Sequence, residues 1–169
     1  MDIYVSPAVA SMIWLCIDEC NTDRWCGRIY TRLNKELIRF RNMNEMLNIF
    51  EIFWDIIGFP QKAVVERTFK KQKEDSLLRE LKEMIRVQYP ENGMKDKIRV
   101  ELSEEDMEKK TGDKGTFVVK IRYRQNSTWQ GHVTWVEENK TVPFRSALEL
   151  LKLLDSAQGE FPEDWTGEE

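Results

Sequence analysis

Residues 25–31 read WCGRIYT and residues 129–135 read WQGHVTW, and these two stretches decide the fold that we expect. In both of them apolar residues recur at alternate positions, which is the pattern of a strand with one buried face. The stretches lie 104 residues apart, and the same offset places residues 13–53 over 117–157 without a gap. Seven positions are then identical, and we expect them to be structural: Ile17/Ile121, Trp25/Trp129, Gly27/Gly131, Phe40/Phe144, Arg41/Arg145, Glu45/Glu149 and Leu47/Leu151. The chain thus predicts an internal duplication.

Each predicted copy contains two strands and a helix. In the first copy, residues 13–17 alternate as a strand does, and a polar turn leads from them into residues 25–31. The helix of this copy begins at a capping box formed by Asn42 and Glu45, and Ser146 stands at the position equivalent to Asn42. The same strand, turn, strand and helix signals therefore occur in the same order in both copies.

These units predict an α+β fold with one four-stranded antiparallel sheet and both helices on one face of it. A two-stranded unit is marginally stable in water, so we expect the two copies to share the sheet. Gly27 and Gly131 lie inside strands, and we interpret them as positions where a helix packs close to the sheet. The expected organisation is a first β-β-α repeat at 1–60, a charged insert with an amphipathic helix at 61–115, a second β-β-α repeat at 116–159 and an acidic tail at 160–169.

Residues 124–131 read RQNSTWQG, and residues 144–151 read FRSALELL. This combination resembles a family of small uncharacterised proteins from Gram-positive gut anaerobes, whose pattern is R-Q-N-x-x-W-Q-G followed by F-R-S-x-x-E-L-L. The resemblance covers about residues 116–157, and the first copy matches it only in degenerate form, with Cys26 in place of Gln and Asn42 in place of Ser. The family implies no known activity, so the resemblance transfers no catalytic residue.

Composition and charge exclude several classes of protein. Hydrophobic residues make up 41% of the 169 residues, with six Trp and eight Phe, which excludes a chain that is disordered throughout. No apolar run approaches ~20 residues, so we expect no membrane-spanning helix and no membrane partner. Three cysteines are too few for a disulfide scaffold, and we expect free thiols and a cytoplasmic location. The acidic part of the chain is its end, where residues 155–169 hold six acids and no Lys or Arg.

We expect no catalytic residue, no cofactor and no metal. The sequence contains no glycine-rich phosphate-binding motif. Cys16, Cys20, Cys26 and His132 offer the ligand types of a zinc site, but their spacing is not that of paired knuckles, and a cysteine on a strand is usually a small hydrophobe. A thiol nucleophile would need a nearby base, and His132 is the only histidine. Both readings are minor alternatives to a protein that is not an enzyme.

Alternation also predicts an outer face of the sheet, which points away from the two helices. We define the candidate binding face as the basic and aromatic residues placed there: Trp14, Arg28, Tyr30, Arg32, Lys120, Arg122 and His132. Basic residues interleaved with aromatic ones on an open sheet are typical of surfaces that hold single-stranded nucleic acid. The simpler alternatives are that these residues solvate an exposed sheet, or that the insert covers it.

We therefore expect a non-enzymatic module that binds or regulates another macromolecule, with a protein as the first candidate partner. The helix predicted at 43–57 carries a second apolar face with Ile49, Ile52 and Ile56, which offers a surface for self-association. A nucleic-acid binder that uses the candidate binding face is the alternative. A variant is an anti-CRISPR-like inhibitor of a host nuclease, whose acidic tail would stand in for phosphates.

Overall fold

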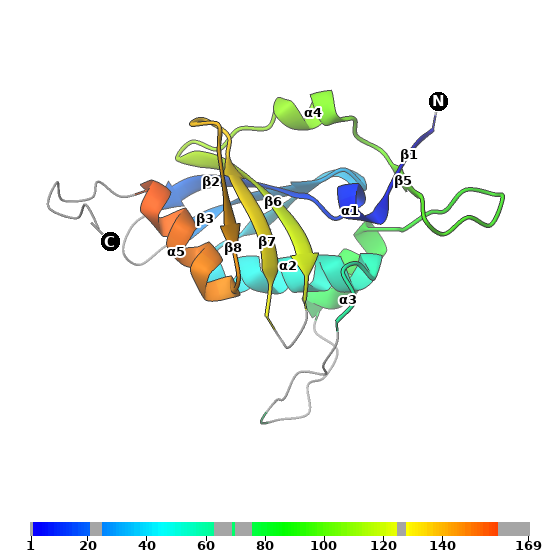
Figure 1. The fold of residues 1–169 in the computed structure, drawn as a ribbon, viewed down its shortest axis with the longest axis horizontal. Coiled ribbons are helices and arrows are strands. Elements are labelled where there is room, and N and C mark those ends of the chain that lie inside the picture. The colour runs from blue at the N-terminus through cyan, green and yellow to red at the C-terminus, as the bar shows by residue number, and fades with distance from the viewer. Residues whose placement is uncertain (1, 21–24, 63–68, 70–75, 125–127, 159–169) are drawn as a thin grey trace, which may run out of the picture.

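A six-stranded antiparallel sheet forms the centre of the molecule, with the strand order β4-β3-β2-β6-β7-β8 (Figure 1). The computed structural model describes residues 2–20, 25–62, 69, 76–124 and 128–158. The strands of this sheet are β2 (Ile13–Cys20), β3 (Trp25–Thr31), β4 (Asn34–Phe40), β6 (Gly115–Tyr123), β7 (Gln130–Trp135) and β8 (Lys140–Phe144). A separate two-stranded sheet pairs β1 (Ile3–Val5) with β5 (Ile98–Val100). The helices are α1 (Pro7–Ala10), α2 (Met43–Ile57), α3 (Ser76–Met84), α4 (Glu104–Glu108) and α5 (Ala147–Gln158).

The expected four-stranded sheet of two β-β-α units is wrong, because each half of the sheet has a third strand. β4 follows β3 after the two residues Arg32 and Leu33, and β8 follows β7 after a short turn. Both strands begin with polar residues, Asn34 and Lys140, and polar residues at that place resemble a turn. The physical reason for the difference is the pairing of these strands along β3 and β7, which holds their polar beginnings in extended backbone.

The pairing registers of the first two strands of each half agree at the offset of 104 residues. Ile17 pairs with Gly27 in the first half, and Ile121 pairs with Gly131 in the second. The register then shifts by one residue directly after Ile17 and directly after Ile121, so an irregularity occurs at the same place in both halves. The two three-strand units meet along β2 and β6, which places β4 and β8 at the two ends of the sheet.

Gly27 and Gly131 are required by the neighbouring strand and not by a helix, contrary to the interpretation from the sequence. A Cβ atom at Gly27 would lie 1.9 Å from the carbonyl oxygen of Cys16, and one at Gly131 would lie 2.1 Å from that of Lys120. Both glycines sit next to the register shift, where two backbones approach more closely than in a regular ladder. Only a residue without a side chain fits this approach.

α2 and α5 pack on the same face of the sheet, where they enclose the main hydrophobic core. Odd-numbered strand residues such as Leu15, Ile29 and Val119 are buried on this face, together with Phe50 and Trp54 of α2. The Trp54 ring also donates a hydrogen bond of 3.1 Å from Nε1 to the carbonyl oxygen of Ser11. The alternation seen in the sequence therefore identifies the face that the helices cover.

The helix starts follow from the caps found in the sequence. The Asn42 side chain accepts a hydrogen bond of 2.8 Å from the Glu45 amide, and the Ser146 hydroxyl accepts one of 3.0 Å from the Glu149 amide. Glu45 itself pairs with Arg41 at 3.2 Å and does not reach back to the cap. Arg145 and Glu149 form the equivalent ion pair at 3.8 Å. α2 ends at Gly58, which adopts the left-handed conformation.

The insert between the two halves divides its elements between both faces of the sheet. α3 lies beside α2, whereas α4 lies on the opposite side of the sheet (Figure 1). The short strand β5 pairs with β1 at the beginning of the chain. Within the described residues, no helix combines the length and the apolar character that a membrane crossing needs. Residues 101–114 are the part of the insert that reaches the outer face, where the candidate binding face lies.

Candidate functional site

The first half of the outer face is covered by residues 101–114. Trp14 and Tyr30 are only 7% and 6% exposed, and they form a second, smaller hydrophobic cluster with Cys16, Leu102 and Met107. Met107 belongs to α4 and is fully buried, so the short helix places one apolar side chain on the sheet. Trp14 and Tyr30 of the candidate binding face thus take part in internal packing and offer no open ring surface for stacking.

Arg32 anchors the beginning of the covering segment. Its Nε donates a hydrogen bond of 3.0 Å to the carbonyl oxygen of Leu102. The carbonyl oxygen of Arg32 accepts hydrogen bonds from the amides of Glu101, at 2.8 Å, and Leu102, at 3.1 Å. Because Arg32 is buried and bonded on both sides, this member of the candidate binding face also serves the fold.

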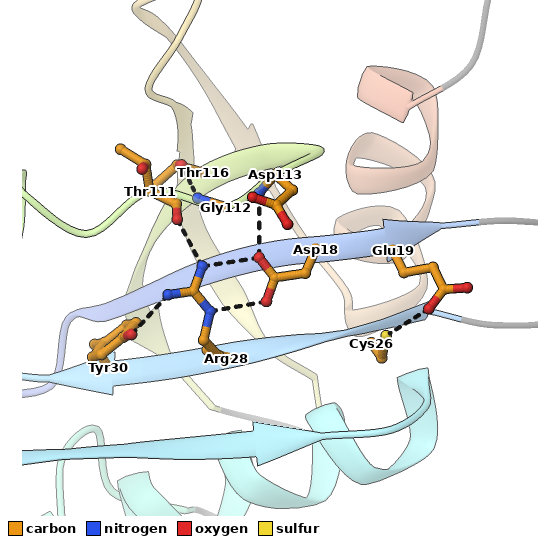
Figure 2. A network of polar contacts seen from close by, with 9 residues as sticks. All are labelled: Asp18, Glu19, Cys26, Arg28, Tyr30, Thr111, Gly112, Asp113 and Thr116. Carbon is orange, nitrogen blue, oxygen red and sulfur yellow. Dashed lines mark hydrogen bonds and ion pairs between the residues drawn. The ribbon is translucent and has the colours of Figure 1, made fainter.

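Arg28 anchors the end of the covering segment through the network in Figure 2. Its guanidinium donates two hydrogen bonds to the Asp18 carboxylate, at 2.8 and 2.9 Å, one of 2.8 Å to the Tyr30 hydroxyl and one of 2.7 Å to the carbonyl oxygen of Thr111. Asp18 also accepts a hydrogen bond of 3.2 Å from the Asp113 amide. A two-point contact of this kind fixes both partners in one orientation.

The network controls the charge state of Asp18. The hydrogen bond from Arg28 holds the pKa of the Asp18 carboxyl below its usual value, and partial burial opposes this effect only in part. The same bond raises the pKa of the Arg28 guanidinium. Lys110 lies 5.0 Å from the centre of the Tyr30 ring, which adds a cation–π contact above the same strand. The charges of Asp18 and Arg28 thus compensate each other inside the molecule.

The second half of the outer face carries the remaining basic residues. Lys120 and Arg122 of β6 are exposed, and His132 of β7 is half-buried and lies opposite Lys120 in the register. β7 and β8 also carry Thr134 and Thr141 on this face, and the two hydroxyls share a hydrogen bond of 2.8 Å. The structure therefore divides the candidate binding face into a covered aromatic half and an open basic half.

The three cysteines do not converge on a common point with His132. Cys16 lies on β2 and His132 on β7, and β6 runs between these two strands. Burial raises the pKa of the Cys16 thiol to about 11, and Cys26 donates to the Glu19 carboxylate at 3.5 Å. Among the described residues there is no group of three or more side chains placed to hold a metal ion.

The second apolar face of α2 is used inside the molecule. Ile49 is fully buried, and Ile52 and Ile56 are half-buried and pack against the main core. α3 contacts α2, and its residue Leu81 belongs to the same core, as does Ile85 directly after this helix. The side chains on which self-association was expected to depend are therefore already in contact with the rest of the fold.

A buried polar cluster joins the end of α2 to the β6–β7 side of the second half. The Arg124 side chain is 3% exposed and donates to the carbonyl oxygen of Pro60, at 2.8 and 2.6 Å, and to Asp55 at 2.7 Å. The Trp129 ring donates a hydrogen bond of 2.8 Å from Nε1 to the Glu51 carboxylate. It also lies edge-on to the Trp54 ring, with 4.9 Å between the ring centres. All polar atoms named here have partners, so this cluster is structural.

The structure also contains an apolar groove that the sequence reading missed. The groove has a volume of about 200 Å³ and lies between the last strand of the sheet and the last helix. The following residues line it: Phe117, Val133, Trp135, Lys140, Val142, Leu153, Leu154, Ser156 and Ala157. Val142 points to the core side of the sheet but is 40% exposed. We call this site the β8–α5 groove.

A sequence signal for the β8–α5 groove exists at residues 140–144, which read KTVPF. Val142 and Phe144 alternate with Thr141 and Pro143, which is the pattern of a strand, and Pro within a strand indicates an edge of the sheet. Leu148 of α5 is 60% exposed and continues the apolar surface beyond the groove. The sequence pattern predicts only two strands in this half, so no strand is expected at these residues.

Comparison of the chain with protein-family models, with curated proteins and with solved structures gives no significant match. The resemblance to the uncharacterised family thus stays a prediction. The acidic tail at 160–169, to which the nuclease-inhibitor variant was attached, lies outside the described residues. The site is therefore interpreted from its own geometry.

Proposed function

We propose that this protein is a non-enzymatic module that binds another protein, and that the β8–α5 groove is its binding surface. The observation that carries the proposal is the exposure of Val142 on the face of the sheet where the other apolar strand residues are buried or half-buried. An apolar groove bordered by few polar groups is the usual form of a recognition site. A surface of this kind is stabilised when a partner removes it from water.

Two further features of the β8–α5 groove support protein binding. β8 is the last strand of the sheet, so one side of its backbone has no neighbouring strand among the described residues. Sheet edges and grooves beside helices are the two places where peptide segments commonly dock. Lys140 lies at the border of the groove and offers a single charge that would orient a partner.

The proposal is tested by comparing Val142→Glu with Thr141→Glu in affinity purification, with the bound proteins identified by mass spectrometry. The two residues are neighbours on β8 and both are exposed, but they point to opposite faces of the sheet. We expect a partner that the wild type and Thr141→Glu retain and Val142→Glu loses. Identical sets of bound proteins for the two variants would contradict the proposal.

Binding of single-stranded nucleic acid is the second candidate, and one observation favours it. Lys120 and Arg122 are exposed on the uncovered half of the outer face and have no ion-pair partner among the described residues. Binding through these residues would weaken steeply with added salt and on Arg122→Glu. Absence of binding to a labelled oligonucleotide at low salt would remove this candidate.

The proposal also includes the origin and the location of the protein. The registers of the first two strands are equal at an offset of 104 residues, and the third strands agree at Gly27–Phe40 with Gly131–Phe144 and at Ile29–Ile38 with Val133–Val142. This agreement supports an internal duplication of a unit with three strands and a helix. We keep the cytoplasm as the proposed location, in which Cys20 and Cys26 would stay reduced. Intact-mass measurement after alkylation under native conditions would detect these thiols.

A further inference from the structure

We infer that the β8–α5 groove accepts an amphipathic helix of a partner protein, seated as α3 is seated on the first half of this chain. This inference rests on the proposed function and adds to it the kind of segment that binds. It starts from the equivalence of β8 and α5 with β4 and α2, because Val142 pairs with Val133 as Ile38 pairs with Ile29. Val142, Leu153 and Ala157 are the equivalents of Ile38, Ile49 and Phe53 at the offset of 104 residues.

In the first half, the equivalent surface is covered by α3. The side-chain amide of Asn34 donates a hydrogen bond of 3.3 Å to the carbonyl oxygen of Met84. This bond connects the end of α3 to the beginning of β4. Leu81 and Ile85, four residues apart, are buried in the main core. Residues of β4, α2 and α3 also line one common cavity of about 740 Å³, so α3 faces Ile38 of β4 across it.

Equivalent residues of the two halves differ in exposure where α3 is present in one half only. Ile38 on β4 is 7% exposed, whereas Val142, at the same position on β8, is 40% exposed. No described element of the second half takes the place that α3 occupies in the first. The unit of three strands and one helix therefore leaves an apolar surface uncovered, and in the first half the chain covers it with a helix of its own.

The groove and its counterpart in the first half are lined by side chains of different size. Phe53 fills the interior of the first half and is 1% exposed, but Ala157 stands at the equivalent position and lines the groove. Ala157 leaves space on the helix side of the groove, whereas Phe117 and Trp135, which stand where the first half has Ile13 and Thr31, add volume on the strand side. A volume of about 200 Å³ remains, which apolar side chains of a partner can enter from outside.

Charge indicates which helix would fit. Lys140 lines the groove and places a positive charge at its border. Among the described residues Lys140 has no ion-pair partner. A partner helix with aliphatic residues at i and i+4 and a carboxylate near Lys140 would satisfy both features.

A stapled peptide of residues 76–87 is the probe, because this sequence already covers the equivalent surface. The staple joins positions 79 and 83, which are exposed in α3, and keeps a short peptide helical. Titration into the full-length ¹⁵N-labelled protein should shift the amide signals of Val133, Val142 and Leu153. The same peptide with Leu81→Asp should bind at least about tenfold more weakly, because a buried carboxylate is costly.

Two variants of the protein complete the test. Ala157→Phe restores the side chain of the first half and should weaken the probe at least about tenfold, while Thr141→Glu on the outer face should bind as the wild type does. Val142→Glu is the second groove variant, in case Ala157→Phe does not fold. Shifts confined to α2 and β4, equal affinity for both peptides, or equal affinity for all variants would overturn the inference.

The outcomes separate this inference from the proposed function. If Val142→Glu loses an identified partner but the helical probe does not bind, the protein-binding function stands and the helix is wrong. If Val142→Glu loses no partner and the helical probe does not bind, both the proposed function and this inference are wrong. Sedimentation equilibrium adds one more outcome: a dimer that Ala157→Phe abolishes would show that a second copy of this chain occupies the groove, which would also overturn a partner helix.

Discussion

Trp14 and Val118 lie opposite each other in the central strand pair of the sheet, and they are also equivalent positions of its two halves, since their numbers differ by 104. An approximate twofold axis therefore passes between them, and the neighbouring pairs Ile13–Val119 and Leu15–Phe117 exchange under it. The axis relates the strands but not their surroundings. The insert covers the Trp14 side of the outer face and the β4 side of the inner face, and this asymmetry leaves the β8–α5 groove open.

Gly27→Ala and Gly131→Ala should each destabilise the protein by ~1–3 kcal/mol or prevent folding, because the new methyl group would meet the backbone of the neighbouring strand. The added Cβ atoms would lie 1.9 and 2.1 Å from the nearest carbonyl oxygens, so the two effects should be similar. Urea unfolding curves of both variants measure the free energy of unfolding. Thr141→Ala on the exposed edge strand is the control, and equal stability of all three proteins would contradict the close approach.

Asp18→Asn should remove about 1–2 kcal/mol of stability near neutral pH, because the variant loses a charged partner of Arg28. The pKa of Asp18 is lowered in the folded protein, so this stabilisation is present above the unfolded pKa of about 3.9 and disappears as the pH falls through the folded pKa. The difference between wild type and variant should thus shrink below about pH 4.

Unfolding in urea at several pH values checks the effect of Asp18. Asp113→Asn is the matched control, because Asp113 contacts the network through its backbone amide and its side chain is exposed. A difference between wild type and Asp18→Asn that stays constant at acidic pH would show that the carboxylate does not contribute through its charge.

Arg124→Met should cost about 3–4 kcal/mol, since it leaves the carbonyl oxygen of Pro60 without its buried donor. Arg122→Met, two residues earlier, removes an exposed guanidinium and should change stability by less than about 0.5 kcal/mol. Thermal and chemical unfolding of the two variants gives the comparison. Similar losses for both would mean that the cluster at the end of α2 contributes little.

Met107→Asp should release the covering segment from the outer face, because it places a carboxylate against Trp14 and Tyr30. The amides of Glu101 and Leu102 should then exchange with deuterium faster, since their acceptor is the carbonyl oxygen of Arg32. Glu105→Ala on the exposed side of the same helix is the control. Unchanged exchange at both amides in Met107→Asp would contradict the role of this contact.

The sequence predicts a local feature well where the atoms that stabilise it lie within a few residues of each other. The caps at Asn42 and Ser146 depend on atoms three residues away, and the end of α2 depends on the conformation that Gly58 adopts. The alternation in residues 13–17 identifies the face that is buried by helices. In contrast, the third strand of each half begins with polar residues, and its extended form depends on pairing with a strand elsewhere in the chain.

The sequence by itself determined which residues share a face of each strand, where the helices begin, and that two stretches 104 residues apart follow one pattern. Only the tertiary structure decided what packs on those faces: that residues 101–114 bury Trp14 and Tyr30, that α3 covers the first half, and that Val142 stays uncovered in the second. The physical reason is that side-chain direction follows from the local backbone, whereas burial depends on segments distant in the sequence, whose contacts leave no periodic pattern.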